Sequence, residues 1–220
     1  MKRVFLTVAA AAILSAAAGA LPISVGSGVV FGTEAVKLDY DNNRFDMKQN
    51  YIGLSTFFDA HYVSLGIDLM NGNVDLSGRA FREDENAPGT YSLNQVVQSY
   101  SALMLDINLL GKLPLPLFGL EQVSVFPMLG AGFKMVQIVQ EQTPLFGAYN
   151  DIKILFGVGG DFDISERVFL RFVLLPHYAL AIPSTKIIVA SHFDKPNWSA
   201  HGGFGASGHI MAGFRFGALD

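Results

Sequence analysis

Polar and apolar residues alternate along several separate segments of this chain. The segments Val63–Leu69, Leu103–Leu109 and Ile152–Val158 each place apolar residues at every second position. Successive side chains of a β-strand point to opposite faces, so this period predicts strands with one apolar face. The segment Gly208–Phe216 repeats the pattern near the end of the chain. No segment beyond the N-terminal region shows a sustained helical period.

Eight segments carry this pattern, and together they predict an all-β protein. The predicted strands are 23–35, 50–58, 62–75, 96–109, 122–138, 151–163, 167–180 and 204–217. The short connections are 59–61 and 164–166, and the long ones are 36–49, 76–95, 139–150 and 181–203. Short turns at one rim and long loops at the other are typical of up-and-down barrels. The predicted fold is therefore an eight-stranded antiparallel up-and-down β-barrel.

The apolar face of such a strand can meet either a protein core or lipid. In a soluble ligand-binding barrel the apolar faces would point inward, and the opposite faces would meet water. The opposite faces here are rich in glycine and poor in charge, as at Phe126, Met128 and Gly130. Each predicted strand also has about the 9–11 residues that a tilted strand needs to cross a bilayer. We therefore predict a transmembrane β-barrel with its apolar faces toward lipid.

The composition agrees with an outer surface that is partly hidden from water. Half of the 220 residues are hydrophobic and 15% are charged, against about 25% charged in a typical soluble domain. The net charge of −4 argues against nucleic-acid binding. The absence of cysteine excludes disulfides, cysteine-bound metals and thiol nucleophiles. No phosphate-binding loop or dinucleotide motif is present, and neither a metal nor another cofactor is predicted.

The N-terminal region has the features of a cleavable export signal. Lys2 and Arg3 are followed by the apolar run Val4–Leu14 and by the small residues Ala18-Gly19-Ala20. This order matches the charged, apolar and cleavage regions of a signal peptide. The apolar run is too short for a spanning helix, which needs about 20 strongly apolar residues. We predict that residues 1–20 are removed and that 21–220 form the barrel domain.

The terminal strand, together with the features above, is similar to that of a known group of proteins. The export signal, the eight alternating strands and the pattern Ile210-x-Ala212-x-Phe214-x-Phe216 resemble the small eight-stranded outer-membrane proteins. That group includes the OmpA membrane domain, OmpX and OmpW. The resemblance implies a bacterial outer-membrane location, with the lipids of that membrane as partners. It also implies that the barrel-assembly machinery reads Gly208–Phe216, although residues 217–220 follow the aromatic residue that usually ends such a strand.

The other face of each strand is expected to form the lumen. An eight-stranded barrel is just wide enough to be filled by its own side chains, which excludes a wide aqueous pore. If a turn centres on Glu166, Asp161 lies across from Arg171, and we predict an ion pair between them. Asp106 and Arg215 are expected at the same short-turn end, where they would complete a polar plug. The other predicted lumen residues are Asp68, Met70, Phe126, Met128, Lys134, Leu155, His209 and Met211.

Above this plug the predicted lumen is largely apolar, which leaves two interpretations open. Flexible methionine and phenylalanine side chains either fill a core or line a tunnel. An apolar lumen above a polar plug resembles OmpW, and this implies a narrow channel for small hydrophobic or amphipathic solutes, with lateral escape into the membrane. The alternative is a structural or adhesive barrel that binds host or envelope ligands through long surface loops. No catalytic residues are predicted, since His177-Tyr178-Ala179 lacks the serine expected of a lipid A deacylase.

Overall fold

The computed structural model describes residues 23–40, 43–84, 87–116, 122–139, 148–183 and 198–216. The predicted signal peptide and the last four residues lie outside this part of the chain. Within the described residues, no helix is long and apolar enough to cross a membrane. The strands are β1 (Ile23–Tyr40), β2 (Asn43–Ala60), β3 (Val63–Asp84), β4 (Ala87–Lys112), β5 (Leu115–Pro116), β6 (Val123–Val139), β7 (Ala148–Asp163), β8 (Val168–Pro183) and β9 (Trp198–Phe216).

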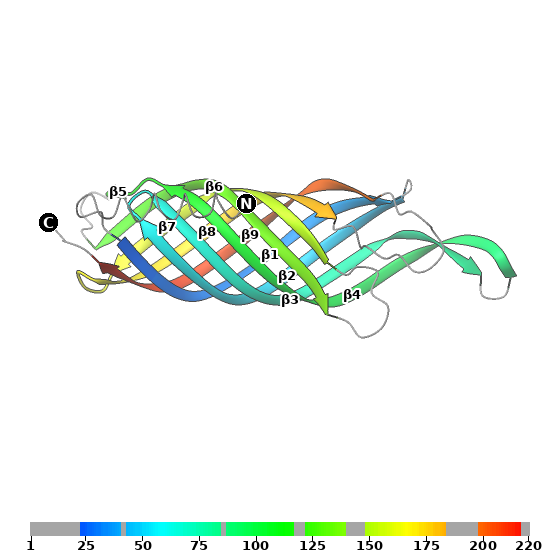
Figure 1. The fold of residues 1–220 in the computed structure, drawn as a ribbon, viewed down its shortest axis with the longest axis horizontal. Helices are drawn as coiled ribbons and strands as arrows, with labels where there is room; N and C mark the ends of the chain where they lie inside the picture. The colour runs from blue at the N-terminus through cyan, green and yellow to red at the C-terminus, as the bar shows by residue number, and fades with distance from the viewer. Residues whose placement is uncertain are drawn as a thin grey trace, which may run out of the picture.

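The strands form one closed antiparallel sheet (Figure 1). Their order is β4-β3-β2-β1-β9-β8-β7-β6, and pairing between β4 and β6 closes the ring. The two-residue strand β5 pairs with β6 just beyond the end of β4, so β4 and β5 act as one strand of the wall. This confirms the predicted all-β, eight-stranded antiparallel barrel.

Two of the predicted long loops are wrong because the strands continue through them. In the segment 36–49, β1 and β2 stay paired up to Tyr40 opposite Asn43. In the segment 76–95, β3 and β4 stay paired up to Asp84 opposite Ala87. In these extensions the outward side chains, such as Lys37, Asp46 and Lys48, are polar and exposed, whereas Val36 and Met47 are buried in the lumen. The apolar outer face that marks the other parts of the strands in sequence is therefore missing here. The predicted loops 139–150 and 181–203 lie largely outside the described residues, although β7 and β9 begin within them.

The short connections gather at one end of the barrel, which we call the short-turn end. His61 and Tyr62 alone join β2 to β3, and His61 takes a positive φ of 53°, as tight turns require. β1 begins and β9 ends at this same end (Figure 1). At the opposite end β3 and β4 project beyond the other strands as a long hairpin (Figure 1).

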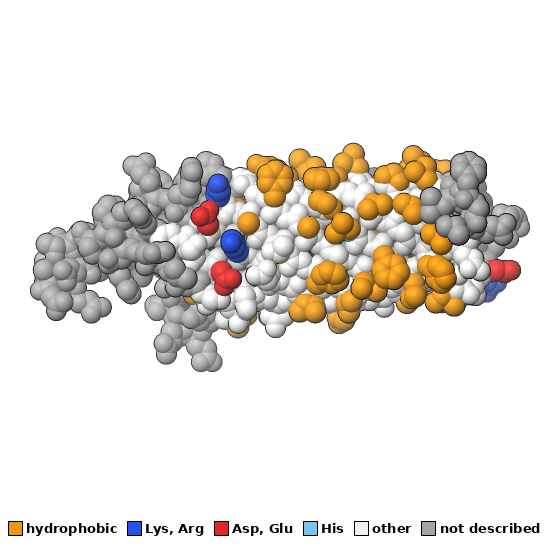
Figure 2. Space-filling view, turned by 180° about the vertical axis from the view of Figure 1, so that it is seen from behind, with side chains coloured by type: hydrophobic (Ala, Val, Ile, Leu, Met, Phe, Trp, Pro, Cys, Tyr) orange, Lys and Arg blue, Asp and Glu red, His pale blue; other side chains and the backbone are white. Residues whose placement is uncertain are grey.

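The outer wall carries the apolar faces of the strands. Figure 2 shows hydrophobic side chains over the middle of the barrel, with charged side chains only toward its ends. Leu54, Leu69 and Leu129 are 67%, 60% and 66% exposed, whereas Ser55 and Asp68, their neighbours in sequence, are buried. A water-soluble barrel has the reverse arrangement. The observed arrangement, with apolar side chains outside and polar side chains inside, agrees with a transmembrane barrel surrounded by lipid.

Candidate functional site in the barrel lumen

The lumen is filled by layers of side chains that alternate between polar and apolar along the barrel axis. From the short-turn end, β8 places Arg171, then Val173 and Leu175, and then His177 on the inner face, all buried. The other strands follow a similar order. The order of these layers decides what can pass through the lumen.

The first layer, here called the lower ionic layer, contains Asp59, Lys112, Asp161, Arg171 and Arg215. Arg171 donates from Nε and Nη2 to both carboxylate oxygens of Asp161, at 2.6 and 2.8 Å. Its Nη1 atom donates to Asp59 Oδ2 at 2.6 Å, and Lys112 bonds to the same oxygen. Arg215 lies farther out, with Nη2 3.7 Å from Asp161 Oδ2. Such bidentate, charge-assisted bonds are the strongest hydrogen bonds available to protein side chains.

Three phenylalanine rings surround the guanidinium group of Arg171. The ring centroids of Phe57, Phe126 and Phe169 lie 4.2, 5.1 and 5.1 Å from its Cζ atom. A cation over an aromatic face gains energy from the ring quadrupole, most strongly where water is excluded. The rings therefore stabilise the buried charge and close the lumen around it.

Lumen glycines make room for these rings. A side-chain carbon at each glycine would overlap one ring, and the pairs are Gly26 with Phe57, Gly159 with Phe126 and Gly213 with Phe169. The inner glycines noted in the sequence therefore accommodate bulky neighbours at these positions and leave no tunnel there.

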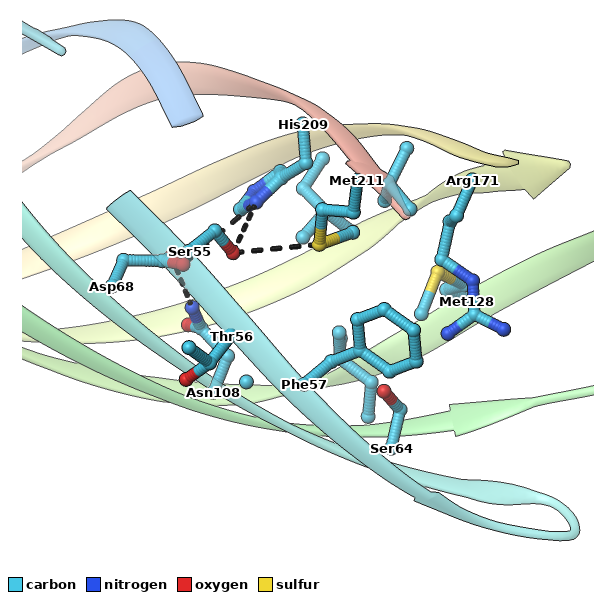
Figure 3. Close-up of a pocket in the computed structure, with 14 residues that line it drawn as sticks. Ser55, Thr56, Phe57, Ser64, Asp68, Asn108, Met128, Arg171, His209 and Met211 are labelled. Atoms are coloured by element: carbon cyan, nitrogen blue, oxygen red, sulfur yellow. Dashed lines mark hydrogen bonds and ion pairs between the residues drawn. The ribbon is translucent and has the colours of Figure 1, made fainter. Parts of the chain in front are cut away.

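Above the lower ionic layer lies an apolar layer. It belongs to a buried apolar cluster, in which Phe169 lies on the short-turn side of Arg171 and the other members lie above it. The members are Phe57, Leu110, Phe126, Met128, Leu155, Phe169, Val173, Leu175 and Met211. A cavity of about 30 Å³ lies against this layer (Figure 3). Its polar lining residues are Ser55, Thr56, Ser64, Asp68, Asn108, Arg171 and His209. A cavity needs roughly 10–15 Å³ to hold one water molecule, so this space accepts about two.

The next layer, the middle polar layer, joins β2, β3, β4, β7 and β9. Lys153 bonds to Asp106, and Asn108 Nδ2 donates to Asp68 Oδ2 at 3.3 Å. His209 lies between two hydroxyl groups, with Nδ1 3.2 Å from Ser55 Oγ and Nε2 3.2 Å from Ser207 Oγ. All residues of this layer are buried, and they are Ser55, Asp68, Asp106, Asn108, Lys153, Ser207 and His209.

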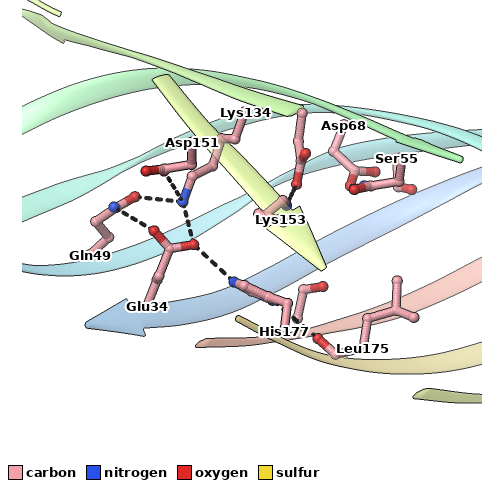
Figure 4. Close-up of polar contacts among 12 residues, drawn as sticks. Glu34, Gln49, Ser55, Asp68, Lys134, Asp151, Lys153, Leu175 and His177 are labelled. Atoms are coloured by element: carbon pink, nitrogen blue, oxygen red, sulfur yellow. Dashed lines mark hydrogen bonds and ion pairs between the residues drawn. The ribbon is translucent and has the colours of Figure 1, made fainter. Parts of the chain in front are cut away.

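The next layer, the upper ionic layer, contains Glu34, Gln49, Lys134, Asp151 and His177 (Figure 4), and the buried side chains of Val36, Met47 and Leu76 lie beyond it. Lys134 Nζ lies 2.7 Å from Glu34 Oε2, 2.9 Å from Gln49 Oε1 and 3.2 Å from Asp151 Oδ2. Glu34 Oε2 is also 2.8 Å from His177 Nε2. All five side chains are 0–1% exposed. This layer closes the lumen a second time.

The structure brings most of the predicted lumen residues together. Asp161 and Arg171 are directly opposite in the β7–β8 register and form the expected ion pair. Arg215 joins them at the edge of the layer. The eight predicted lining residues, all buried, are Asp68, Met70, Phe126, Met128, Lys134, Leu155, His209 and Met211.

Two expectations about the lumen need correction. Asp106 is not part of the plug, because it bonds to Lys153 in the middle polar layer. The lumen above the plug is not apolar up to its mouth, because the upper ionic layer follows. The sequence did not identify four residues of this layer, which are Glu34, Gln49, Asp151 and His177. Glu34 and Asp151 lie close to the ends of the predicted strands 23–35 and 151–163, and Gln49 lies just before the predicted strand 50–58. Continuing the alternation of β1 outward from Val30 would have placed Glu34 on the inner face.

Among the described residues, no three His, Cys, Asp or Glu side chains come together to hold a metal ion. Of the two serine hydroxyls beside His209, that of Ser55 lines the cavity of about 30 Å³.

The fold and the layered lumen define a class of protein: a closed, narrow, eight-stranded barrel with an apolar outer wall. The crystal structure of the outer membrane protein OprG from Pseudomonas aeruginosa is similar, with a TM-score of 0.51 and 9% identity over 91% of this chain and 98% of that chain. Neisserial surface protein A gives a TM-score of 0.39 and 11% identity, covering 89% of this chain and 97% of its own. The crystal structure of Ail from Yersinia pestis gives a TM-score of 0.36 and 13% identity, and the match covers 90% of this chain and 99% of Ail.

These likenesses show the fold and nothing finer. No family model matches the chain, and no curated protein matches its sequence. Of the three structures, OprG alone is similar enough to support an assignment. The chain thus has the fold of the small eight-stranded outer-membrane β-barrels.

Proposed function

We propose that this protein is a narrow, normally closed channel of a bacterial outer membrane that carries small hydrophobic or amphipathic solutes. The observation that carries this proposal is a weak point in the wall beside the apolar layer. Pairing between β7 and β8 runs from Asp163 to Val158 and resumes at Leu155, but it skips Phe156 and Gly157. Pro176 stands in the skipped part of β8 and has no N–H group to donate.

The gap in the β7–β8 pairing lies at the level of the apolar layer, where a lateral exit would open. Leu155 and Leu175 flank it on the inner side and belong to the apolar layer. Phe156 and Leu174 flank it on the outer side and are 45% and 52% exposed toward the membrane. An apolar solute in this layer would thus be separated from lipid only by strands that lack two hydrogen-bonded pairs. The ionic layers above and below block passage along the axis, which favours release sideways.

Solute uptake into proteoliposomes tests the channel. We expect uptake of a small apolar fluorescent solute to exceed that of protein-free vesicles and to fall in Pro176→Val, which restores a donor to the ladder. Pro127→Val is the matched control, because Pro127 also lies in a wall strand but its neighbouring pairs with β7 are complete. Uptake equal to that of empty vesicles, or equal loss in both variants, contradicts the proposal. Planar-bilayer recordings should show little ion conductance, since the ionic layers close the axial path.

A second function, ligand binding at the cell surface, is favoured by the β3–β4 hairpin. These strands stay paired from Gly78 opposite Val96 out to Asp84 opposite Ala87. Among the described pairs, β2 leaves β3 at Gly78, and β6 leaves β4 at Ser101. Outer-membrane barrels carry their long connections on the outside of the cell, which would present this hairpin to host or envelope ligands. Deleting 79–95 should then abolish adhesion to matrix proteins while solute uptake persists.

The assembly and lipid contacts of the barrel also remain proposals. We infer that Gly208–Phe216, as the closing strand β9, is the segment that the barrel-assembly machinery reads. Its support is its position: β9 pairs with β1 and seals the barrel.

A further inference from the structure

The upper ionic layer places both ring nitrogens of His177 against hydrogen-bond acceptors (Figure 4). The Nε2 atom lies 2.8 Å from Glu34 Oε2, and the Nδ1 atom lies 3.3 Å from the backbone carbonyl oxygen of Leu175. Glu34 also pairs with Lys134, so its carboxylate is ionised. An ionised carboxylate and a carbonyl oxygen can only accept hydrogen bonds. Both ring nitrogens of His177 must therefore donate, and an imidazole that donates twice is positively charged.

The charge count of the layer requires the same proton. Lys134 contributes one positive charge, Glu34 and Asp151 contribute one negative charge each, and Gln49 is neutral. With an uncharged His177 the layer would hold one negative charge in excess. Because these side chains are buried, water does not screen that excess, and a buried unpaired charge is strongly unfavourable. The protonated ring makes the layer neutral.

The other elements around the ring bring no further cation to the layer among the described residues. β9 faces the ring with Gly205, where a side-chain carbon would overlap the imidazole of His177. β2 adds the neutral, buried phenol of Tyr51. In the middle polar layer beneath, Lys153 is already paired with Asp106. The ring proton of His177 is therefore the charge that completes the layer.

Asp151 is the other group that could hold the proton. Neither of its carboxylate oxygens has a hydrogen-bond partner among the described residues. A proton on either oxygen would have no acceptor there, whereas both N–H groups of His177 have one. The hydrogen bonds therefore favour the proton on His177.

We propose that the upper ionic layer is a proton-sensitive closure of the lumen, with His177 as its sensor. While the ring carries two protons, it joins β8 to Glu34 of β1 and the layer is neutral. Histidine is the side chain that changes charge near neutral pH. Loss of one proton removes one of the two donated bonds and leaves one buried negative charge uncompensated. The closure then loosens and water enters. The inference goes beyond solute transport and does not depend on it.

Nitrogen NMR of the imidazole rings tests the protonation in the intact barrel. The His177 signals are identified by their absence from His177→Gln. At about pH 7 both ring nitrogens of His177 should be protonated, and at about pH 9 only one should be. His209 is the control in the same lumen, because its two serine partners satisfy a neutral ring with one protonated nitrogen. A His177 ring with a single protonated nitrogen at about pH 7 overturns the proposal.

Thermal unfolding tests the closure. The readout is the midpoint temperature at which heated, detergent-solubilised barrel changes its mobility on SDS gels. The proton stabilises the folded barrel at the lower pH, so stability is lost as the pH rises. Between about pH 7 and about pH 9 we expect the wild-type folding equilibrium constant to fall about tenfold, or roughly 3–6 °C in midpoint. His177→Gln should lose this response, and His61→Gln, a control in the β2–β3 turn, should keep it.

The wild-type measurements decide the matter even if His177→Gln fails to fold. Equal wild-type midpoints at the two pH values contradict the closure. A response that persists in His177→Gln and disappears in Asp151→Asn places the proton on Asp151 and refutes the sensor. A water-soluble paramagnetic probe should broaden the His177 signals at about pH 9 and leave them sharp at about pH 7. Sharp signals at both pH values would show that the layer stays closed.

Discussion

The lower ionic layer predicts that removing one arginine destabilises the whole barrel. Arg171 is 1% exposed and makes three hydrogen bonds to two carboxylates. In Arg171→Met the side chain keeps a similar volume, but Asp161 loses its bidentate partner. Asp59 keeps Lys112, so the main cost falls on Asp161. Removing one partner of a buried pair costs about 3–5 kcal/mol.

This cost is large enough to measure on heated gels. For a chain of this size about 1 kcal/mol corresponds to roughly 2–4 °C in midpoint, so Arg171→Met should lower the midpoint by roughly 6–20 °C. Arg215→Met is the matched control, because Arg215 is 20% exposed and its 2.7 Å partner Asp163 is 32% exposed. Exposed pairs contribute about 0–1 kcal/mol, so its midpoint should fall by no more than about 4 °C.

A second-site variant separates lost charge from lost packing. If the orphaned carboxylate of Asp161 causes the damage, adding Asp161→Asn to Arg171→Met removes that charge and should recover part of the midpoint. If the three rings packed on the guanidinium group account for the loss, the double variant stays as unstable as the single one. An Arg171→Met midpoint equal to that of wild type refutes the structural role altogether.

Three further substitutions follow from the same structure and the same gel assay. Gly213→Val should destabilise the barrel by about 1–3 kcal/mol because its side chain meets the Phe169 ring, whereas the outward-facing Ala212→Val should be close to neutral; equal midpoints would show that the ring has free space. Leu54→Arg should lower the free energy of unfolding by about 2–4 kcal/mol if this exposed position faces the membrane core. Asn50→Arg lies farther from the short-turn end of β2 and should lower it by about 0–1 kcal/mol. Lys134→Met should cost about 3–5 kcal/mol by leaving buried carboxylates unpaired, and an unchanged midpoint would mean that the upper ionic layer does not stabilise the closed barrel.

The strand pattern and one local pair follow from the sequence because both depend on near neighbours. Alternation places side chains in or out, and it identified the lumen face of β3, β4, β6, β7, β8 and β9. The pair of Asp161 and Arg171 follows from one short turn, since a turn of known length fixes the cross-strand register. Outside the membrane the same reasoning fails. There the outward side chains of the strand extensions are polar, as at Lys37 and Lys48, although Val36 and Met47 remain buried, so the apolar outer face that identifies a strand is missing.

Contacts across the lumen could not be predicted, because they depend on strand tilt and barrel closure. Lys153 of β7 reaches Asp106 of β4, although β6 lies between these strands in the wall. Glu34 of β1 joins Lys134, 100 positions away, and His177, 143 positions away. Glu34 meets these two partners only after β9 has paired with β1 and the wall has curved fully. The upper ionic layer therefore links β1 to β6 and β8 through contacts that an open sheet does not have. It stabilises the closed barrel specifically, and the same charges that close the lumen also hold its first and later strands together.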